Sequence, residues 1–238
     1  MYSGEGLLPQ CAKKNYFWIA CTNVLSSTCQ YEALKHVSFP LQTLGKSGKM
    51  MPVMVSGRLI LGKRYTRSDV FTVIIVTAGI VAFSAAGPVT SKTAGPDARP
   101  WLGFFLICCY LASDSFTPTL QERLFARERT SVNNQMLWVN LCSCGVSLGG
   151  SVIHGWGATF SAIAFVLNHP AIVPDLLLLA LSQVTGQTFI FRTLKDHGAL
   201  TLAAIMTLRQ FLSVLVSTFR FGHPVTGLQW TAVLVIFA

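Results

Sequence analysis

Long apolar stretches, separated by short polar connections, recur along the whole chain. Each approaches the roughly 20 residues that a helix needs to cross a bilayer, and none shows the regular polar face of a helix packed on a soluble core. We predict spans near residues 16–34, 40–60, 70–86, 101–119, 132–153, 175–194 and 200–219. A final run, 228–238, has about half the length of a span. The pattern predicts an all-α membrane protein with about seven complete spans and a partial last one.

The composition agrees with a membrane protein and excludes an ordinary soluble domain. Hydrophobic residues make up 52% of the 238 residues and charged residues 11%, whereas a soluble domain carries about 25% charged residues. The cysteines inside apolar runs lack partners at zinc spacing, so we expect neither a metal nor another cofactor. The net charge of +9 belongs either to loops that face the cytosol or to a site for an anionic cargo.

Basic residues alternate between the connections as hairpin threading requires, because short cytosolic loops collect Lys and Arg. Alternate connections carry these groups: Lys13 and Lys14; Lys63, Arg64 and Arg67; Arg123, Arg127 and Arg129; Arg192 and Lys195. The connections between them carry few basic residues, and residues 154–174 carry none. We therefore predict that these four basic groups face the cytosol and that residues 154–174 form a luminal loop.

A faint internal repeat is visible at an offset of 160 residues, which places Lys49 on Arg209. An odd number of predicted spans separates the two copies, so they would lie inverted in the membrane. Inverted repeats around a site at the midplane are an architecture of secondary transporters. We therefore interpret 1–238 as a single transporter domain, in which 15–88 is the remainder of a first repeat and 99–238 is a second repeat that ends within its last helix.

Three basic residues, Lys46, Lys49 and Arg209, lie inside predicted spans, where each costs about 2.5–3.5 kcal/mol at a helix centre. Lys46 and Lys49 are three residues apart and share a helix face. The functional interpretation is a substrate-binding pocket in which these bases neutralise a phosphate or sulfate. The alternative is that they pair with Glu32 and Asp114, although two acids do not neutralise three bases. For Glu32 we expect an ion-pair or gating role.

Uncharged polar residues within the spans supply candidates for the rest of a substrate site. Gln187 and Gln210 both fall in the second repeat near Arg209 and offer amides for the edge of a nucleotide base. Tyr31 offers an aromatic face. Interhelical hydrogen bonding is the alternative explanation for such residues.

No arrangement of residues predicts catalysis. Residues 145–149 match the G-x-S-x-G motif of hydrolases, but that motif requires a strand-to-helix turn and here lies inside an apolar span. We interpret Gly145 and Gly149 as small residues for helix packing. We therefore expect no catalytic residues and no enzyme.

Short motifs within the spans carry a resemblance to a known family. They lie at residues 23–27, 29–35, 38–40, 114–116, 186–191, 206–210 and 222–223, together with Lys46, Lys49 and Pro52. With these motifs the chain resembles the nucleotide-sugar transporter family of the drug/metabolite transporter superfamily. The stretch 206–210 looks closest to the Golgi branch that carries adenosine 3′-phospho 5′-phosphosulfate (PAPS), and a neighbouring branch of the endoplasmic reticulum, similar to UDP-galactose transporters, also keeps two lysines and an arginine.

The resemblance implies a ten-helix fold of two inverted five-helix repeats with alternating access around one central site. It implies an antiporter that brings PAPS from the cytosol into the Golgi lumen, in exchange for an adenosine monophosphate. Carried over by position, Lys46, Lys49 and Arg209 match the family's basic site residues. The expected partners are an anionic nucleotide and the lipid bilayer, with no nucleic acid, and a homo-oligomer is left open.

Compared with the family pattern, the chain is expected to lack the first two helices and to end inside the tenth. The alternatives to PAPS transport are therefore of two kinds. One is a nucleotide-sugar carrier of the UDP-galactose type, or an ATP/ADP exchanger, in the endoplasmic reticulum membrane. The other is an inactive, truncated paralogue.

Overall fold

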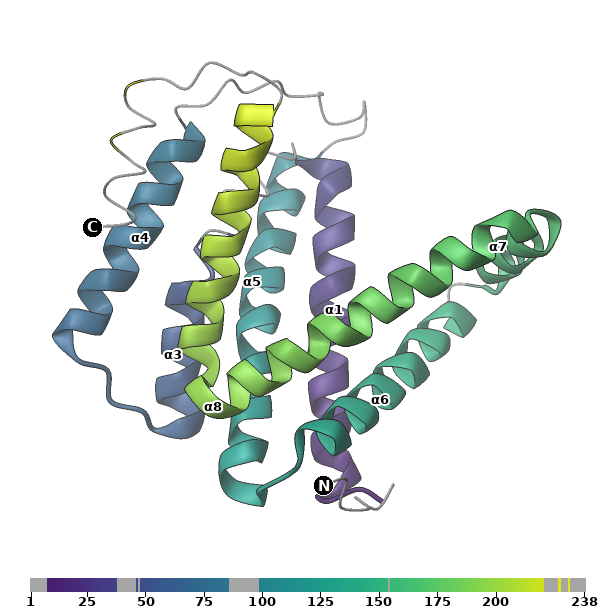
Figure 1. Ribbon diagram of the computed structural model, residues 1–238, viewed down its shortest axis with the longest axis horizontal. Coiled ribbons are helices and arrows are strands. Elements are labelled where there is room, and N and C mark those ends of the chain that lie inside the picture. Colours follow the sequence, from purple (N-terminus) through teal and green to yellow (C-terminus); the bar gives the residue numbers. More distant parts are fainter. Residues whose placement is uncertain are drawn as a thin grey trace.

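The described part of the chain is built from helices joined by short turns (Figure 1). The computed structural model describes residues 8–37, 46, 48–85, 99–153, 155–220, 227 and 231. The helices are α1 (Lys13–His36), α3 (Met50–Leu61), α4 (Arg67–Ala85), α5 (Pro100–Arg123), α6 (Val132–Ile153), α7 (Gly157–Asn168) and α8 (Val173–Arg220), with the π-helix η1 (Leu124–Glu128) and the 3-10 helix η2 (Pro170–Ile172). The all-α prediction is confirmed.

Most of the predicted spans coincide with observed helices. The prediction at 132–153 has the bounds of α6, and α1, α4 and α5 begin and end within a few residues of the predicted limits. Of the predicted span 40–60, only the part from α3 onward can be compared in full, because several preceding residues lie outside the described ranges. The predicted final run at 228–238 also lies mostly outside them.

Two features of the second half differ from the prediction. Residues 154–174, predicted as a loop, contain the helix α7, because the sequence Gly157–Asn168 is apolar and has no charged residue or internal proline. The spans predicted at 175–194 and 200–219 form one element, α8, which is interrupted at Gly198 with φ 84° and ψ 174°. The predicted gap between the two spans thus corresponds to a sharp break in the backbone.

Length and apolar composition single out one possible membrane-spanning segment in the described part of the chain, Pro170–Leu212. That segment contains the break at Gly198. The helix α1 has 24 residues, but it includes polar side chains such as Gln30 and Glu32, which lower its mean hydropathy. Polar side chains of this kind are tolerated in a spanning helix where it faces a bundle interior or a water-filled cavity.

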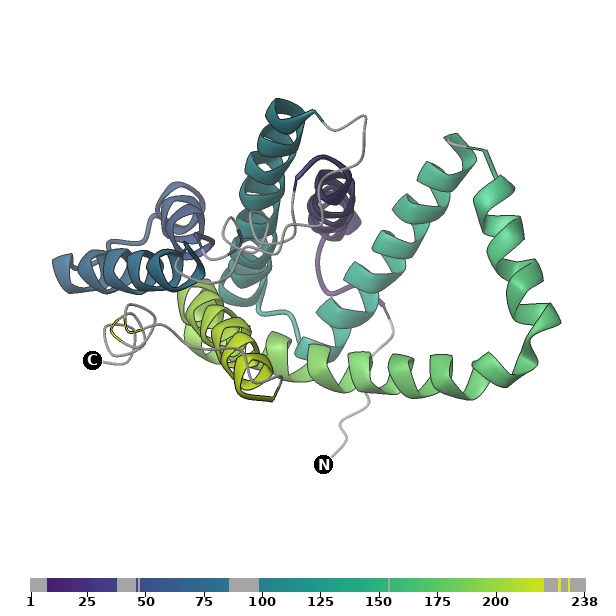
Figure 2. The same cartoon turned by 90° about the horizontal axis from the view of Figure 1, so that it is seen from above.

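The tightest part of the structure is the bundle of α1, α3, α5 and the second half of α8. The most extensive contact joins α1 to α5, and α3 packs against α5 and α8. Buried hydrogen bonds support the α3–α5 contact: the hydroxyls of Ser56 and Thr119 are 2.8 Å apart. The start of α6 packs against α1, whereas the rest of α6, α7 and the first half of α8 extend away from this bundle (Figure 2).

A glycine allows the close approach of α1 and α5. A Cβ on Gly103 of α5 would overlap the Val37 side chain and would lie 3.0 Å from Cβ and 3.3 Å from the carbonyl carbon of His36. Gly145 and Gly149 behave differently, because no heavy atom outside their own helix surroundings lies within 4 Å of a Cβ built at either position. Among the described residues, the structure therefore shows no packing contact for these two glycines.

Replacing Gly103 by leucine is expected to destabilise the protein by about 1–3 kcal/mol, because overpacking forces the helices apart. Leucine favours a helix more than glycine does. A loss of stability therefore reports the contact between α1 and α5 and not the helix propensity. Thermal unfolding in detergent measures the effect. Gly145→Leu is the matched control, and an equal loss in both proteins would contradict the close approach.

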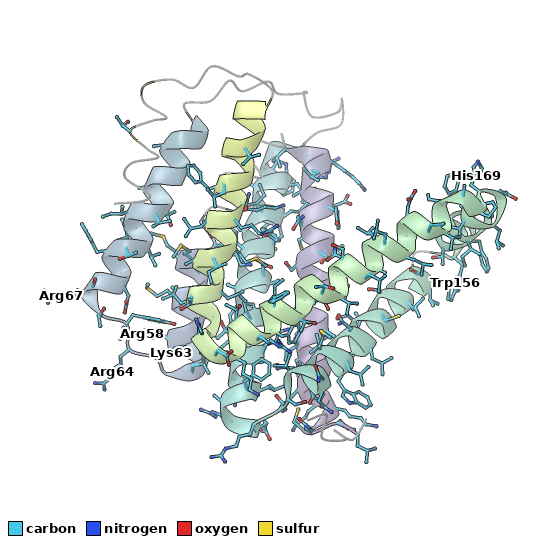
Figure 3. The ribbon with its side chains drawn as sticks, in the orientation of Figure 1. Arg58, Lys63, Arg64, Arg67, Trp156 and His169 are labelled. Atoms are coloured by element: carbon cyan, nitrogen blue, oxygen red, sulfur yellow. The ribbon has the colours of Figure 1, made fainter. Side chains whose placement is uncertain are left out.

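The four predicted cytosolic groups lie at the same end of the bundle. Figure 3 shows Lys63, Arg64 and Arg67 in the turn between α3 and α4. The start of α1, the turn after α5 and the break in α8 lie at this end too (Figure 1). Lys195, beside the break, lies with its Nζ 5.9 Å from the Phe125 ring centroid. We call this the basic end of the bundle.

Candidate substrate-binding site

The two lysines of the predicted site both contact α5. Lys49 is the N-cap residue of α3, and its Nζ is 2.6 Å from Oδ2 of Asp114, with side chains that are 20% and 25% exposed. The Nζ of Lys46 lies 5.9 Å from the centroid of the Tyr110 ring. Because Tyr110 and Asp114 are four residues apart, they lie on one face of α5. That face provides one carboxylate and one aromatic ring for two ammonium groups.

Arg209 lies on the same face of α8 as Leu202 and Met206, at i+7 and i+3 from them. Leu202 belongs to a buried cluster that contains Met50 of α3, and Met206 packs against it. Hence Arg209 comes one turn beyond this cluster. Its side chain is exposed, and within the described residues it has no ion-pair partner.

The register between α3 and α8 brings Arg209 to the level of the lysines. The two helices run antiparallel (Figure 1), and a Cβ on Gly198 would lie 3.0 Å from Nζ of Lys63. Arg209 is 11 residues beyond Gly198 (209 − 198), and the residue 11 before Lys63 is Pro52 (63 − 11). Since both helices rise about 1.5 Å per residue, Arg209 lies at about the same height along the bundle as the first turn of α3.

Positive charge exceeds negative charge at this level of the bundle. Asp114 faces the two lysines, whereas Glu32 pairs with Lys35 of its own helix, with Nζ and Oε2 2.7 Å apart and both side chains well exposed. The alternative in which Glu32 neutralises the buried lysines does not match this geometry. The Asp114 carboxylate therefore faces two lysines, and Arg209 adds a third cation at about the same height, so the excess of positive charge favours an anion.

The structure does not join the other predicted residues to the lysines by any contact among its described residues. Gln187 accepts a 2.8 Å hydrogen bond from Nδ2 of Asn140, which links α8 to α6 on the far side of the break at Gly198. This is the interhelical bond that the alternative explanation expects. Gln210 is half-buried next to Arg209, and Tyr31 is 66% exposed on α1. Their contact with substrate stays a prediction.

Sequence reasoning missed Tyr110 as a partner of Lys46. Its spacing of four residues from Asp114 was the signal that could have found it, since both must lie on one helix face. Among the described residues, no three His, Cys, Asp or Glu side chains come together in a way that could hold a metal ion.

Sequence reasoning also missed a polar junction at the basic end. The carboxylate of Glu122 in α5 contacts Nζ of Lys63, and its Oε2 accepts a 2.9 Å hydrogen bond from the backbone N–H of Ala199. The second half of α8 begins at Ala199, so Glu122 caps its first turn, where negative charge is favourable. Burial raises the pKa of the nearby Tyr65, and the Glu122 carboxylate raises it further, so this phenol stays neutral at physiological pH. We call these contacts the Glu122 junction.

Basic side chains that lie beside a single acid within a bundle of apolar helices are a feature of membrane transporters for anionic substrates. The chain belongs to the UAA transporter family, whose model matches residues 7–238. This confirms the resemblance to nucleotide-sugar transporters. The family is one of multi-pass membrane transporters and not of enzymes.

Relatives that are named for two different kinds of substrate match the chain about equally well. The adenosine 3'-phospho 5'-phosphosulfate transporter 1 of Dictyostelium discoideum is 37% identical over 98% of this chain and 64% of its own length. The UDP-galactose/UDP-glucose transporter 5B of Arabidopsis thaliana is 40% identical over 93% of this chain and 64% of its own length. The human adenosine 3'-phospho 5'-phosphosulfate transporter 1 is 38% identical over 94% of this chain. The chain spans 50% of the human protein's length and 64% of the other two.

Proposed function

We propose that the protein transports PAPS from the cytosol into the Golgi lumen by exchange with an adenosine monophosphate. The observation that carries this proposal is the excess of positive charge at one height of the bundle, where Asp114 faces Lys46 and Lys49 and the exposed Arg209 lies at about the same height. Cations at this depth are stabilised by an anionic ligand that replaces their lost hydration. PAPS carries a phosphosulfate and a separate 3′-phosphate, so it offers several anionic groups to several bases.

The arrangement of α3 and α8 supports a fold of two inverted repeats. The offset of 160 residues pairs Lys49 with Arg209, and the antiparallel packing of α3 and α8 brings these two residues to one level. We propose that 15–88 and 99–238 belong to the first and second repeats of a ten-helix drug/metabolite-transporter fold. Each repeat then supplies a basic residue to one shared site, which alternating access exposes to either side of the membrane.

Transport of UDP-galactose or UDP-glucose in the endoplasmic reticulum is the second candidate. The 40% identity to the Arabidopsis transporter 5B favours it. A diphosphate needs fewer cations than PAPS, so this candidate predicts that Lys49 and Arg209 suffice and that Lys46 is dispensable.

Uptake by proteoliposomes that contain the purified chain tests the proposal. We expect labelled PAPS to accumulate faster than UDP-galactose or ATP, and preloading with adenosine 5′-monophosphate to accelerate the uptake. The opposite preference, with UDP-galactose ahead of PAPS, would transfer the assignment to the second candidate.

Replacing Arg209 by alanine is expected to reduce PAPS uptake by about 100-fold, because a charge-assisted contact to a desolvated anion is lost. Arg209→Lys should keep part of the activity, since it keeps the charge but loses the bidentate geometry. Arg192→Ala is the matched control, because Arg192 is an exposed arginine on the other half of α8. Unchanged uptake in Arg209→Ala would exclude this residue from the site.

A further inference from the structure

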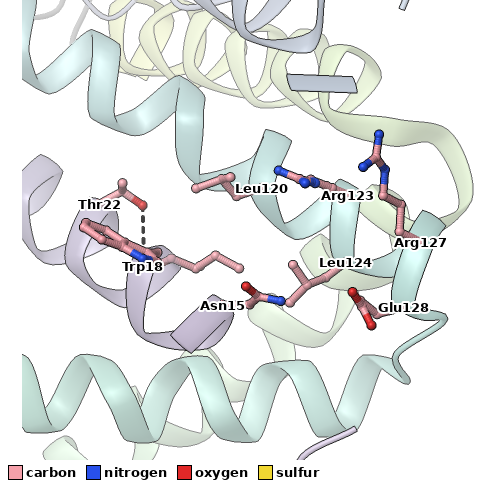
Figure 4. Close-up of a pocket in the computed structure, with 9 residues that line it drawn as sticks. Asn15, Trp18, Thr22, Leu120, Arg123, Leu124, Arg127 and Glu128 are labelled. Carbon is pink, nitrogen blue, oxygen red and sulfur yellow. Dashed lines mark hydrogen bonds between the residues drawn. The ribbon is translucent and has the colours of Figure 1, made fainter. Parts of the chain in front are cut away.

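A cavity lies at the basic end, between the start of α1 and the end of α5 (Figure 4). Its volume is about 370 Å³. Asn15 and Trp18 line it from α1, and Leu120, Arg123 and Arg127 line it from α5 and η1. None of the proposed substrate-binding residues lines this cavity. It is therefore separate from the site around Lys46, Lys49 and Arg209.

The π-helix η1 shapes the cavity. It continues α5 for one wide turn and ends at Arg129, whose φ of 49° stops the helix. Leu124 and Phe125 are buried beneath this turn. Arg123, Arg127 and Glu128 are all exposed, and all three line the cavity (Figure 4). Single π-helical turns within α-helices are frequent at functional sites, because they turn side chains out of the regular register.

The two guanidinium groups lack a counterion in the described structure. The ion pairs of the described residues involve Glu32, Asp114 and Glu122, and none involves Arg123 or Arg127. Glu128 lines the same cavity, so the arginines outnumber the acid two to one, and arginines that form no ion pair can bind a phosphate with paired N–H donors. The Asn15 amide adds an uncharged polar group at the opposite wall.

Apolar side chains form one wall of the cavity: Trp18, Ile19, Leu120 and Leu124. Trp18 is 64% exposed and the neighbouring Phe17 is 49% exposed, at the same end as the basic turns. Tryptophan at the end of a spanning helix lies at the level of lipid headgroups. A basic pocket between helices, open to lipid and bordered by an interfacial tryptophan, has the chemistry that binds anionic headgroups.

We propose that this cavity binds the headgroup of an anionic phospholipid of the leaflet at the basic end. The lipid phosphate lies between Arg123 and Arg127, and the start of an acyl chain lies against Trp18 and Leu120. This proposal does not depend on which substrate the protein transports. It requires only that the basic end lies at a membrane surface.

Lipid binding to the purified full chain tests the proposal by native mass spectrometry and thermal unfolding. Phosphatidylinositol is expected to stay bound and to raise the unfolding temperature more than phosphatidylcholine does. The double variant Arg123→Gln/Arg127→Gln should bind phosphatidylinositol about 25-fold more weakly, at about fivefold for each basic residue near an anionic surface. The matched control is Arg64→Gln/Arg67→Gln, which removes two exposed arginines from the same end without touching the cavity.

Three outcomes would overturn the proposal. An equal loss of phosphatidylinositol binding in the control variant would show that the surface charge of the basic end attracts the lipid without a defined site. Equal binding of inositol 1-phosphate, which has no acyl chains, or displacement of the lipid by PAPS would assign the cavity to a soluble phosphate compound. Unchanged lipid binding in the double variant would exclude the two arginines. If the double variant does not fold, Arg127→Gln alone is used, with an expected loss of about fivefold.

Discussion

The variant Gly198→Ala is expected to lose about 2–4 kcal/mol of stability, which is the largest effect we predict for a single methyl group in this chain. Gly198 has φ 84° and ψ 174°, a conformation that is nearly restricted to glycine. A Cβ there would lie 2.7 Å from Oε1 of Glu122 and 3.0 Å from Nζ of Lys63. The backbone strain therefore adds to a disturbance of the Glu122 junction.

Thermal unfolding in detergent measures this loss, with Gly149→Ala as the control. Gly149 lies within α6 and has no heavy atom within 4 Å of a built Cβ, so alanine there is expected to be neutral or to stabilise the helix by up to about 1 kcal/mol. A Gly198→Ala protein that unfolds at the wild-type temperature would show that the break in α8 tolerates an ordinary side chain.

The variant Lys49→Ala is expected to lower PAPS uptake by about 100-fold, because truncating one partner of a desolvated charge pair costs about 2–5 kcal/mol. The loss has two physical parts. The anion loses a cation, and the carboxylate of Asp114, 2.6 Å from Nζ in the intact protein, remains to repel the anion.

The double variant Lys49→Ala/Asp114→Ala separates substrate binding from a purely structural ion pair. It removes both charges. Stability lost in Lys49→Ala is expected to return, because the Asp114 carboxylate no longer lies unpaired between α3 and α5. Uptake is expected to stay low, because the site still lacks the cation. Recovery of uptake to the wild-type rate would mean that Lys49 neutralises Asp114 and does not bind the substrate. Size-exclusion profiles and unfolding temperatures establish that each variant is folded.

The helices could be predicted from the sequence because their signal is local. Apolar runs located α1, α4, α5 and α6 within a few residues, and the alternation of basic residues grouped the turns that meet at the basic end. The helix α7 was missed because its 12 residues are too few for a span and the segment follows glycines and precedes prolines.

The contacts that define the candidate site could be predicted only in part. Bases inside apolar runs stand out in any sequence, so Lys46, Lys49 and Arg209 were found. Their partners depend on the register between helices, which no local pattern encodes. Asp114 was recognised as an available acid, but nothing short of the packed helices shows that it faces Lys49 or that Tyr110 faces Lys46. The Glu122 junction joins residues more than 50 positions apart and was invisible for the same reason.

Because the helical backbone is interrupted at Gly198, we expect the second half of α8 to tilt as one rigid unit, a lever whose pivot lies at the basic end. Arg209 lies 11 residues along this lever, about 16 Å from the pivot at the usual helical rise. A tilt of about 10° at the pivot therefore moves its guanidinium by about 3 Å, which is enough to make or break contact with an anion held by the lysines. Because Glu122 accepts a hydrogen bond from the first turn of this half of α8, we expect its carboxylate to influence the position of Arg209.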